Sequence, residues 1–274
     1  MLNPATIEAF VKACKRWTEV ITGDVPDSNV TEALLTVNLP DIFVNACGNQ
    51  LPHVIDDVHI CAVEGEIDGG GMTLYGNFRY KIVAFALPGI AQSDTKKDSY
   101  QTLVTGNIVF DSCDAARLIK IGIWEDFVLK AMGTVIGTSL LGPANLANET
   151  TGEYIGKHGN KVCKPPVKFC VFPGFYDKAP PGFGLDPSVG VPVPSWDSAR
   201  LVNELMGSGT LRSCEDWDGF CSPTSGSKLS KLSVATFQDL GYKVNHHLLL
   251  HRQRQCVTRI NSACFVGECK GVCY

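Results

Sequence analysis

The chain has 274 residues, of which 45% are hydrophobic and 19% are charged, a composition that is typical of a globular protein with a sizeable core. The formal net charge is −4 and there is no long basic run, so we expect no nucleic acid among its partners. No run of residues is long and apolar enough for a transmembrane helix, so we also expect no membrane span.

The first part of the chain reads as one helix followed by strands. The helix is expected to begin at Pro4, with Asn3 as its N-cap, and to stop at residues 23–26. Its apolar residues recur at helical spacing and predict one buried stripe of Ile7, Phe10, Val11, Cys14, Trp17 and Ile21. Strands are then expected at residues 33–39, 54–63, 80–87 and 105–110, with a turn at the three glycines 69–71.

Two more helices are expected further along. One spans residues 123–137, with a broad apolar face and with Glu125 and Asp126 in its first turn, where the helix dipole favours acidic side chains. The other spans residues 231–240, with Ser230 as N-cap and Gly241 just beyond its end. Between them the chain is rich in proline and glycine and reads as loops. The expected fold class is therefore a mixture of helices and strands, α/β in the broad sense and α+β in the narrower one.

Cysteine usage indicates an oxidising compartment. The chain has twelve cysteines and no C-x-x-C pair, which favours disulfides over a zinc ribbon, the alternative being buried thiols in a cytosolic protein. Asn29 and Asn148 each begin an N-x-S/T sequon and are candidate glycosylation sites. We therefore expect a secreted, extracellular or cell-surface protein whose targeting segment was removed or is not included in this sequence. The disulfide candidates are Cys14, Cys47, Cys61, Cys113, Cys163, Cys170, Cys214, Cys221, Cys256, Cys264, Cys269 and Cys273.

Four segments, taken in order, resemble one known family. The chain reads ITGDVP after its first helix, GNIVFDS then WEDFVLKAMGTVIG at 106–112 and 124–137, SWD then NELM at 195–197 and 203–206, and LSKLSVATFQDLGYKVN at 229–245. These resemble the leishmanolysin family of metzincin zinc peptidases. There the corresponding passages read G-x-(hydrophobic)-x-F-D, L-E-D-V-(I/V)-L-H-E-M-G-H-V-L-G, H-W before N-E-(L/I)-M, and L-S-x-(V/I)-T-x-x-x-L-x-D-(L/M)-G-Y-x-V-N. The likeness covers about residues 3–245.

The resemblance implies a metzincin-like architecture in three parts. Residues 1–142 would form an N-terminal lobe, with a twisted mixed sheet backed by two helices and a vestigial active-site helix. Residues 143–245 would form a loop-rich lobe that carries the methionine turn and the last helix. Residues 246–274 contain four cysteines and would form a disulfide-rich tail, since so short a segment cannot build a core of its own.

The resemblance also implies that the catalytic positions have been replaced. Active members bind Zn²⁺ through two histidines at i and i+4 of one helix and a third from a distant loop, and a glutamate acts as the general base. In this chain the corresponding residues are Lys130 and Thr134 for the helical histidines, Ser195 for the third histidine and Ala131 for the glutamate. Met206 retains the position of the methionine turn and is expected to be structural.

The replacements do not suit zinc. A protonated Lys130 has no lone pair to donate and repels a divalent cation, Ala131 cannot move a proton, and hydroxyls are weak zinc ligands. We therefore expect no zinc and no other cofactor. The three polar positions, Lys130, Thr134 and Ser195, are expected to form a small hydrogen-bonded cluster, the alternative being that Lys130 binds an anionic ligand or a partner's carboxylate.

The rest of the sequence offers little to replace the lost site. The histidines are His53, His59, His158, His246, His247 and His251, and only His247 and His251 have the i, i+4 spacing of two ligands on a helix. Asp56 and Asp57, and the acidic residues of 64–68, are better explained as solvated turns than as a calcium site. No G-x-S-x-G motif indicates a serine nucleophile.

The sequence therefore predicts a secreted, non-catalytic pseudopeptidase of the leishmanolysin type. Its role would be extracellular binding or structural assembly, with a protein partner or further copies of itself. The alternative is an active zinc metalloendopeptidase that uses a rearranged site.

Overall fold

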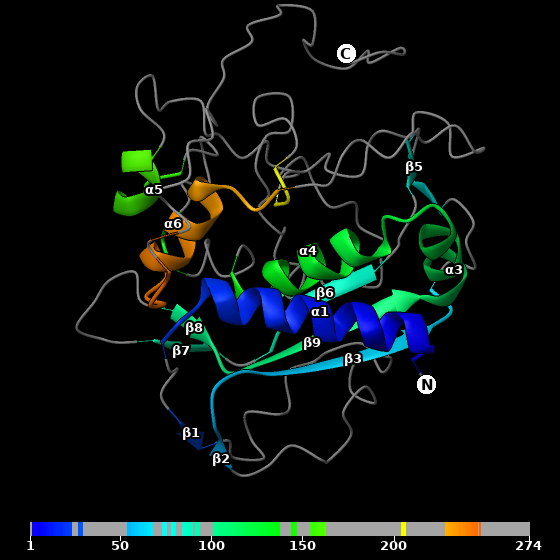
Figure 1. Ribbon diagram of the computed structural model, residues 1–274, viewed down its shortest axis with the longest axis horizontal. Coiled ribbons are helices and arrows are strands. Elements are labelled where there is room, and N and C mark those ends of the chain that lie inside the picture. Colours follow the sequence, from blue (N-terminus) through cyan, green and yellow to red (C-terminus); the bar gives the residue numbers. More distant parts are fainter. Residues whose placement is uncertain are drawn as a thin grey trace, which may run out of the picture.

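The computed structural model of the chain describes residues 2–23, 27–29, 54–67, 73–75, 78–80, 84–89, 91–93, 101–137, 144–146, 154–162, 204–206, 228–245 and 247. Along the described residues a first helix is followed by strands and then by further helices, and they form an α+β fold with a small open sheet, in agreement with the predicted α+β class (Figure 1). Several expected features lie outside the described residues: the strand at 33–39, the turn at 69–71, the boundary at 142/143 and all of the 246–274 tail except His247.

The central sheet has three strands in the order β3-β9-β6. Strand β9 (Thr105–Asp111) lies in the middle and is buried along almost its whole length. It pairs in parallel with β3 (His59–Gly65) and antiparallel with β6 (Ala84–Pro88). The expected strand at 105–110 is therefore confirmed, and its apolar run is explained by burial on both faces of the sheet.

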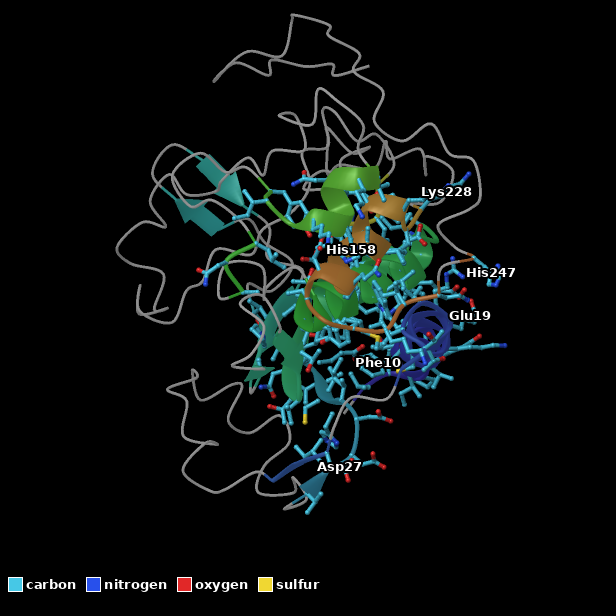
Figure 2. All side chains as sticks on the ribbon, turned by 90° about the vertical axis from the view of Figure 1, so that its left-hand side faces the viewer. Phe10, Glu19, Asp27, His158, Lys228 and His247 are labelled. Atoms are coloured by element: carbon cyan, nitrogen blue, oxygen red, sulfur yellow. The ribbon has the colours of Figure 1, made fainter. Side chains whose placement is uncertain are left out.

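Short strand pairs surround this sheet. Strands β1 (Ser28–Asn29) and β2 (Val54–Ile55), β4 (Thr73–Tyr75) and β5 (Phe78–Tyr80), and β7 (Ala91–Ser93) and β8 (Gln101–Leu103) each form an antiparallel pair. The β1–β2 pair, next to Asp27, lies at the bottom of both views, well below α5 (Lys157–Val162) and its residue His158 (Figures 1 and 2).

The single strand expected at 54–63 is wrong. The chain forms β2, breaks, and begins again at His59, because Asp57 adopts a left-handed backbone with φ of 61°. Aspartate tolerates this conformation better than most residues do, and it cannot occur within a regular strand. The break gives β2 and β3 different partners, since β2 pairs with β1 whereas β3 pairs with β9.

Helix α1 (Pro4–Val20) begins as expected, because the Asn3 side chain accepts a hydrogen bond of 2.9 Å from the Thr6 backbone amide. Its expected buried stripe is partly wrong. Ile7 and Val11 are 49% and 63% exposed. The face that packs on the core is instead made of Thr6, Ala9, Ala13, Trp17 and Val20. Two of these residues, Ala9 and Ala13, are small and let α1 lie close along α4 (Trp124–Ile136). A stripe predicted from large apolar residues does not include such alanines.

Helix α3 (Ser112–Lys120) was not expected. Asp111 ends β9 and also caps this helix, because its Oδ1 accepts bonds of 2.9 Å and 3.0 Å from the Cys113 and Asp114 amides. Its Oδ2 accepts a bond of 2.7 Å from the Ile67 amide, just after β3. Gly122, with φ of 77°, then turns the chain into α4.

Helix α6 (Lys231–Asp239) confirms the last predicted helix. Ser230 caps it, accepting a bond of 3.2 Å from the Ser233 amide, and Gly241 follows it in the left-handed conformation with φ of 104°. The Asp239 carboxylate accepts bonds of 2.6 Å from the Tyr154 hydroxyl and 2.8 Å from the Gly159 amide. This carboxylate therefore holds the start of α5 against α6.

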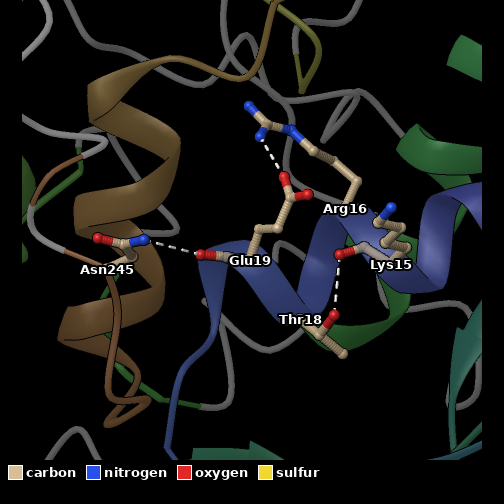
Figure 3. A network of polar contacts seen from close by, with 5 residues as sticks. All are labelled: Lys15, Arg16, Thr18, Glu19 and Asn245. Atoms are coloured by element: carbon tan, nitrogen blue, oxygen red, sulfur yellow. Dashed lines mark hydrogen bonds and ion pairs between the residues drawn. The ribbon is translucent and has the colours of Figure 1, made fainter.

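The segment after α6 returns to α1. The Thr22 amide donates to the Lys243 carbonyl and the Asn245 amide donates to the Val20 carbonyl, both at 2.8 Å. The Asn245 side chain adds a bond of 3.2 Å to the Glu19 carbonyl (Figure 3). Figure 3 also shows an ion pair of 2.7 Å between Arg16 and Glu19 on the exposed side of α1.

Among the described ranges, none of the helices combines the length and the apolar content that crossing a bilayer requires.

The Glu64 carboxylate ties α1 to the sheet and provides a test of this arrangement. It accepts bonds of 3.0 Å from both the backbone and the side-chain amide of Asn3, and a third from the Thr6 hydroxyl. We expect Glu64→Gln to lower the free energy of unfolding by about 1–3 kcal/mol, because an amide N–H₂ would then face these donors. Urea denaturation measures the effect. The matched control is Glu66→Gln at an exposed position, and an equal loss in both variants would contradict the tie.

Candidate functional site

The candidate site is built on α4, where two glycines leave a notch in the helix surface. A Cβ atom on Gly133 would lie 2.4 Å from Cζ2 of Trp17 and 2.8 Å from Sδ of Met206. A Cβ atom on Gly137 would lie 2.3 Å from Cε1 of Phe237. Real Cβ atoms do not approach other atoms so closely, so only glycine allows these three side chains to fill the notch.

Trp17 joins the three helices at this notch. Its indole N–H donates a bond of 3.0 Å to the Leu129 carbonyl of α4, and its ring centroid lies 4.9 Å from that of Phe237 in α6. Trp17 and Phe237 are 4% and 1% exposed. The position of α4 relative to both neighbours is therefore fixed by close packing together with a hydrogen bond.

Helix α4 distributes the predicted site residues between its faces. Ala131 is buried in the core, whereas Lys130 and Thr134 are half-buried and lie one turn apart on the same face. Asp126 occupies the same face one turn before Lys130 and is also half-buried. Ser195 lies outside the described residues, so the expected cluster of Lys130, Thr134 and Ser195 stays a prediction.

Met206 lies under α4, as its place in the notch requires, and it is 1% exposed. The segment that carries it is anchored on both sides. The Leu205 amide donates a bond of 3.0 Å to the Lys228 carbonyl, and Glu204 forms an isolated bridge with Lys228. The packing is consistent with the structural role expected of Met206.

Glu204 is a member of the site that the sequence did not identify as a partner of Lys130. Its carboxylate is 4% exposed. Oε1 accepts a bond of 2.8 Å from the Ser233 hydroxyl and weaker ones of 3.3 Å and 3.4 Å from the Met206 and Ser230 amides. Ser230 and Ser233 are the N-cap and a first-turn residue of α6, where the positive end of the helix dipole favours a carboxylate.

Burial dominates the electrostatics of both charged residues. It lowers the pKa of Lys130 to about 8, and the Glu204 carboxylate opposes this by favouring the protonated amine. Burial likewise raises the pKa of Glu204, against the lowering effect of its hydroxyl and amide donors. The site therefore holds an amine and a carboxyl that both ionise less readily than they do in water.

The chemistry of these side chains does not suit a bound cation. At neutral pH Lys130 is mostly protonated, and its neighbours on α4 offer a methyl group at 131 and a hydroxyl at 134. Within the described ranges, histidine, cysteine, aspartate and glutamate side chains nowhere gather in a group of three that could hold a metal ion.

The other residues singled out from the sequence are dispersed. His59 opens β3, His158 lies in α5 and His247 follows Asn245, whereas His53, His246 and His251 lie outside the described residues. Asp56 lies near Asp27 and Asp57, and their negative charge raises the pKa of its carboxyl, Asp27 contributing most. Asp27 of this group lies at the bottom of Figure 2, well below His158.

Cysteine and sequon positions are described only in part. Cys61 is disulfide-bonded, whereas Cys14 and Cys113 have free thiols, so the expected pairing does not hold for these two. Cys14 lies half-buried in α1 and Cys113 is exposed in the first turn of α3, and a disulfide needs sulfurs about 2 Å apart. Asn29 lies in β1. Outside the described residues lie Asn148 and the remaining cysteines, Cys47, Cys163, Cys170, Cys214, Cys221, Cys256, Cys264, Cys269 and Cys273.

Comparison of the chain with known protein families, with curated proteins and with solved structures finds no match in any of the three.

The notch makes a prediction about the sign of a mutational effect. Helix propensity alone would make Gly133→Ala stabilising by about 0.5–1 kcal/mol. Because the new methyl would overlap Trp17 and Met206, we expect the variant to be destabilised by about 1–3 kcal/mol instead. Thermal and urea denaturation measure the change, and a more stable variant would show that the notch is not closely packed.

The buried amine makes a prediction about pH. Below pH 8 Lys130 is protonated in both the folded and the unfolded chain, whereas between pH 8 and its ordinary value of 10.5 only the unfolded chain keeps the proton. The free energy of unfolding should therefore rise with pH in this window, relative to Lys130→Met, by about 2 kcal/mol between pH 7 and 10. Urea denaturation of both proteins at each pH gives the difference. Lys15→Met, at an exposed position, is the control: because it keeps Lys130, it should show the same rise relative to Lys130→Met as the wild-type chain does.

Proposed function

We propose that the protein is a secreted, non-catalytic relative of the leishmanolysin-type peptidases, with a metzincin-like fold, that acts by binding a protein partner or by assembling with further copies of itself. The proposal rests on the sequence resemblance together with the contrast between two sets of positions. Residues that shape the scaffold have definite packing roles, and residues at the catalytic positions have side chains that do not suit zinc chemistry.

The scaffold positions of the resemblance are those that pack. Gly133 and Gly137 form the notch, Met206 fills it, and Asp239 holds α5 on α6. Tyr242 accepts a bond of 2.7 Å from the Leu103 amide, which connects the end of α6 with β8. These residues explain why the pattern of the family would persist in a chain that has no peptidase activity.

The single observation that carries the proposal is Lys130. This residue stands at the position of the first zinc ligand, and it is a half-buried amine whose charge interacts with the buried Glu204. A cation bound beside it would meet a like charge in a poorly solvated place, where electrostatic repulsion is stronger than in water. The replacement thus opposes metal binding and does more than remove a ligand.

The test is metal content and peptidase activity of the purified protein, compared with a variant in which the family's residues are restored. We expect the wild-type chain to hold far less than one zinc ion per molecule and to cleave no peptide in a chelator-sensitive manner. The variant Lys130→His, Ala131→Glu, Thr134→His, Ser195→His should bind about one zinc ion, since it supplies three imidazoles and a general base.

The outcomes separate the parts of the proposal. Stoichiometric zinc and chelator-sensitive cleavage by the wild-type protein would establish an active metallopeptidase and contradict the proposal. A restored variant that folds but binds no zinc would contradict the metzincin-like geometry. Light scattering after size exclusion tests assembly, since a strictly monomeric protein at high concentration would exclude self-assembly and leave a separate partner.

A further inference from the structure

We propose that α1 is the contact surface of a homodimer, in which an exposed apolar stripe of this helix packs antiparallel against the same stripe of a second copy of the chain. The inference rests on the part of the proposed function that concerns assembly, and it names the surface and the partner. The stripe consists of Ile7, Val11, Cys14 and Thr18.

Helix α1 has two faces that suit burial, and its own chain buries one of them. The buried face is made of Thr6, Ala9, Ala13, Trp17 and Val20. On the stripe, by contrast, Ile7 and Val11 are 49% and 63% exposed. Single exposed apolar residues are common on protein surfaces, but these two lie one turn apart on the same side of one helix. The apolar pattern of α1 therefore exceeds what its own core uses.

The stripe has the spacing of a coiled-coil seam. Its four residues are separated by four, three and four positions, which aligns them along one side of α1. The Thr18 hydroxyl already donates a bond of 2.8 Å to the Lys15 carbonyl, so Thr18 extends the seam without leaving an unsatisfied donor (Figure 3). Figure 2 shows α1 end-on at the right-hand edge of the ribbon, where a second molecule can approach it.

The charges beside the stripe are unevenly balanced. Lys12 contacts the carboxylates of both Glu8 and Glu125, so this end of the flank has an excess of negative charge. Lys15 is exposed two turns after Glu8, and among the described residues no carboxylate lies within ion-pair distance of it. One flank of the stripe is therefore negative toward the start of the helix and positive toward its end.

This charge pattern selects a second copy and its orientation. In a twofold antiparallel pair the same flanks meet, so Glu8 of each copy comes beside Lys15 of the other and two ion pairs form. In a parallel pair this flank would meet the opposite one, which carries Phe10 and Trp17 and no charge. The antiparallel arrangement also places Val11 of one copy beside Cys14 of the other.

The contact is expected to be weak, because it is limited to one helix of 17 residues. Stable specific interfaces bury at least about 1,000 Å² in total, and a single pair of short helices lies near that limit. We therefore expect a reversible dimer with a dissociation constant on the order of tens of micromolar.

The first experiment is sedimentation equilibrium of the full-length chain at concentrations from about 1 μM to about 1 mM. Val11→Glu places a carboxylate in the middle of the seam and should raise the dissociation constant at least about tenfold. Val54→Glu is the matched control, because Val54 is 50% exposed in β2, and it should dimerise like the wild type. A wild-type chain that is monomeric at about 1 mM, or a dimer that Val11→Glu leaves unchanged, would overturn the proposal.

A charge exchange tests the antiparallel orientation. Glu8→Lys and Lys15→Glu should each weaken self-association several-fold, because like charges then meet across the pair. An equimolar mixture of the two variants should associate as tightly as the wild type, since both ion pairs form again in the mixed dimer. Both substitutions are at exposed positions, and circular dichroism checks that the variants fold. A mixture that associates no better than either variant alone would contradict the antiparallel pair.

The free thiols provide a readout within the wild-type chain. Alkylation of the half-buried Cys14 by N-ethylmaleimide should slow several-fold as the chain concentration rises through the dissociation constant, because the dimer covers the stripe. Cys113 is exposed in α3 and should react at the same rate throughout. Equal behaviour of the two thiols would show that the stripe stays uncovered.

These outcomes are distinguishable from those of the zinc experiment. A monomeric chain that holds no zinc overturns the α1 dimer and leaves a non-catalytic protein with a separate partner. A chain that holds zinc and cleaves peptides, and that also dimerises in a manner dependent on Val11, contradicts the proposed function and leaves the dimer in place.

Discussion

The arrangement of this protein depends on the missing side chains at Gly133 and Gly137 of α4. Their absence lets Trp17, Met206 and Phe237 approach the helix backbone, and these three residues come from distant parts of the chain. Interiors are packed as densely as organic crystals, so a contact of this kind allows one relative placement of its elements. Contacts at these two glycines therefore position helix α1, the 204–206 segment and helix α6 relative to α4.

The placement has an electrostatic consequence. Because Met206 must lie in the notch, Glu204, two residues earlier, is carried into the interior, where it is 4% exposed. The donors at the start of α6 and the amine of Lys130 compensate the carboxylate in part.

The sequence predicts those parts of the fold that follow from local chemistry. Helix α4 has a broad apolar face and helix α6 has a side-chain cap at Ser230, and both were found within one residue of the expected bounds. Helix α3 has a cap at Asp111 and basic residues in its last turn, so its signal was present and was overlooked beside the strand before it. The buried face of α1 is set by alanines that fit against α4, which no apolar periodicity within α1 reveals.

In the candidate site, too, features that follow from local sequence were predictable and features that follow from distant contacts were not. The shared face of Lys130 and Thr134 is a property of helical spacing and was predictable. The involvement of Glu204 was not, because it depends on a contact between segments far apart in the sequence, and its lone carboxylate beside Leu205 gives no local sign of burial. The strand break at Asp57 had a local signal, because two adjacent aspartates, which favour turns, interrupt the apolar residues of the expected strand, and the left-handed backbone of Asp57 lies there.

The pairing of residues 20–22 with 243–245 has a consequence for how the chain folds. Its hydrogen bonds join residues separated by as many as 226 positions, and the bridge between Ile21 and Val244 closes α1 against the strand-like segment after α6. Contacts of such high sequence separation form late and slow folding, because a long loop must be closed before they are made. During synthesis on the ribosome, the C-terminal end of α1 can therefore make these contacts only after residues 243–245 have emerged. Until then the end of α1 lacks the partners that hold it in the native structure.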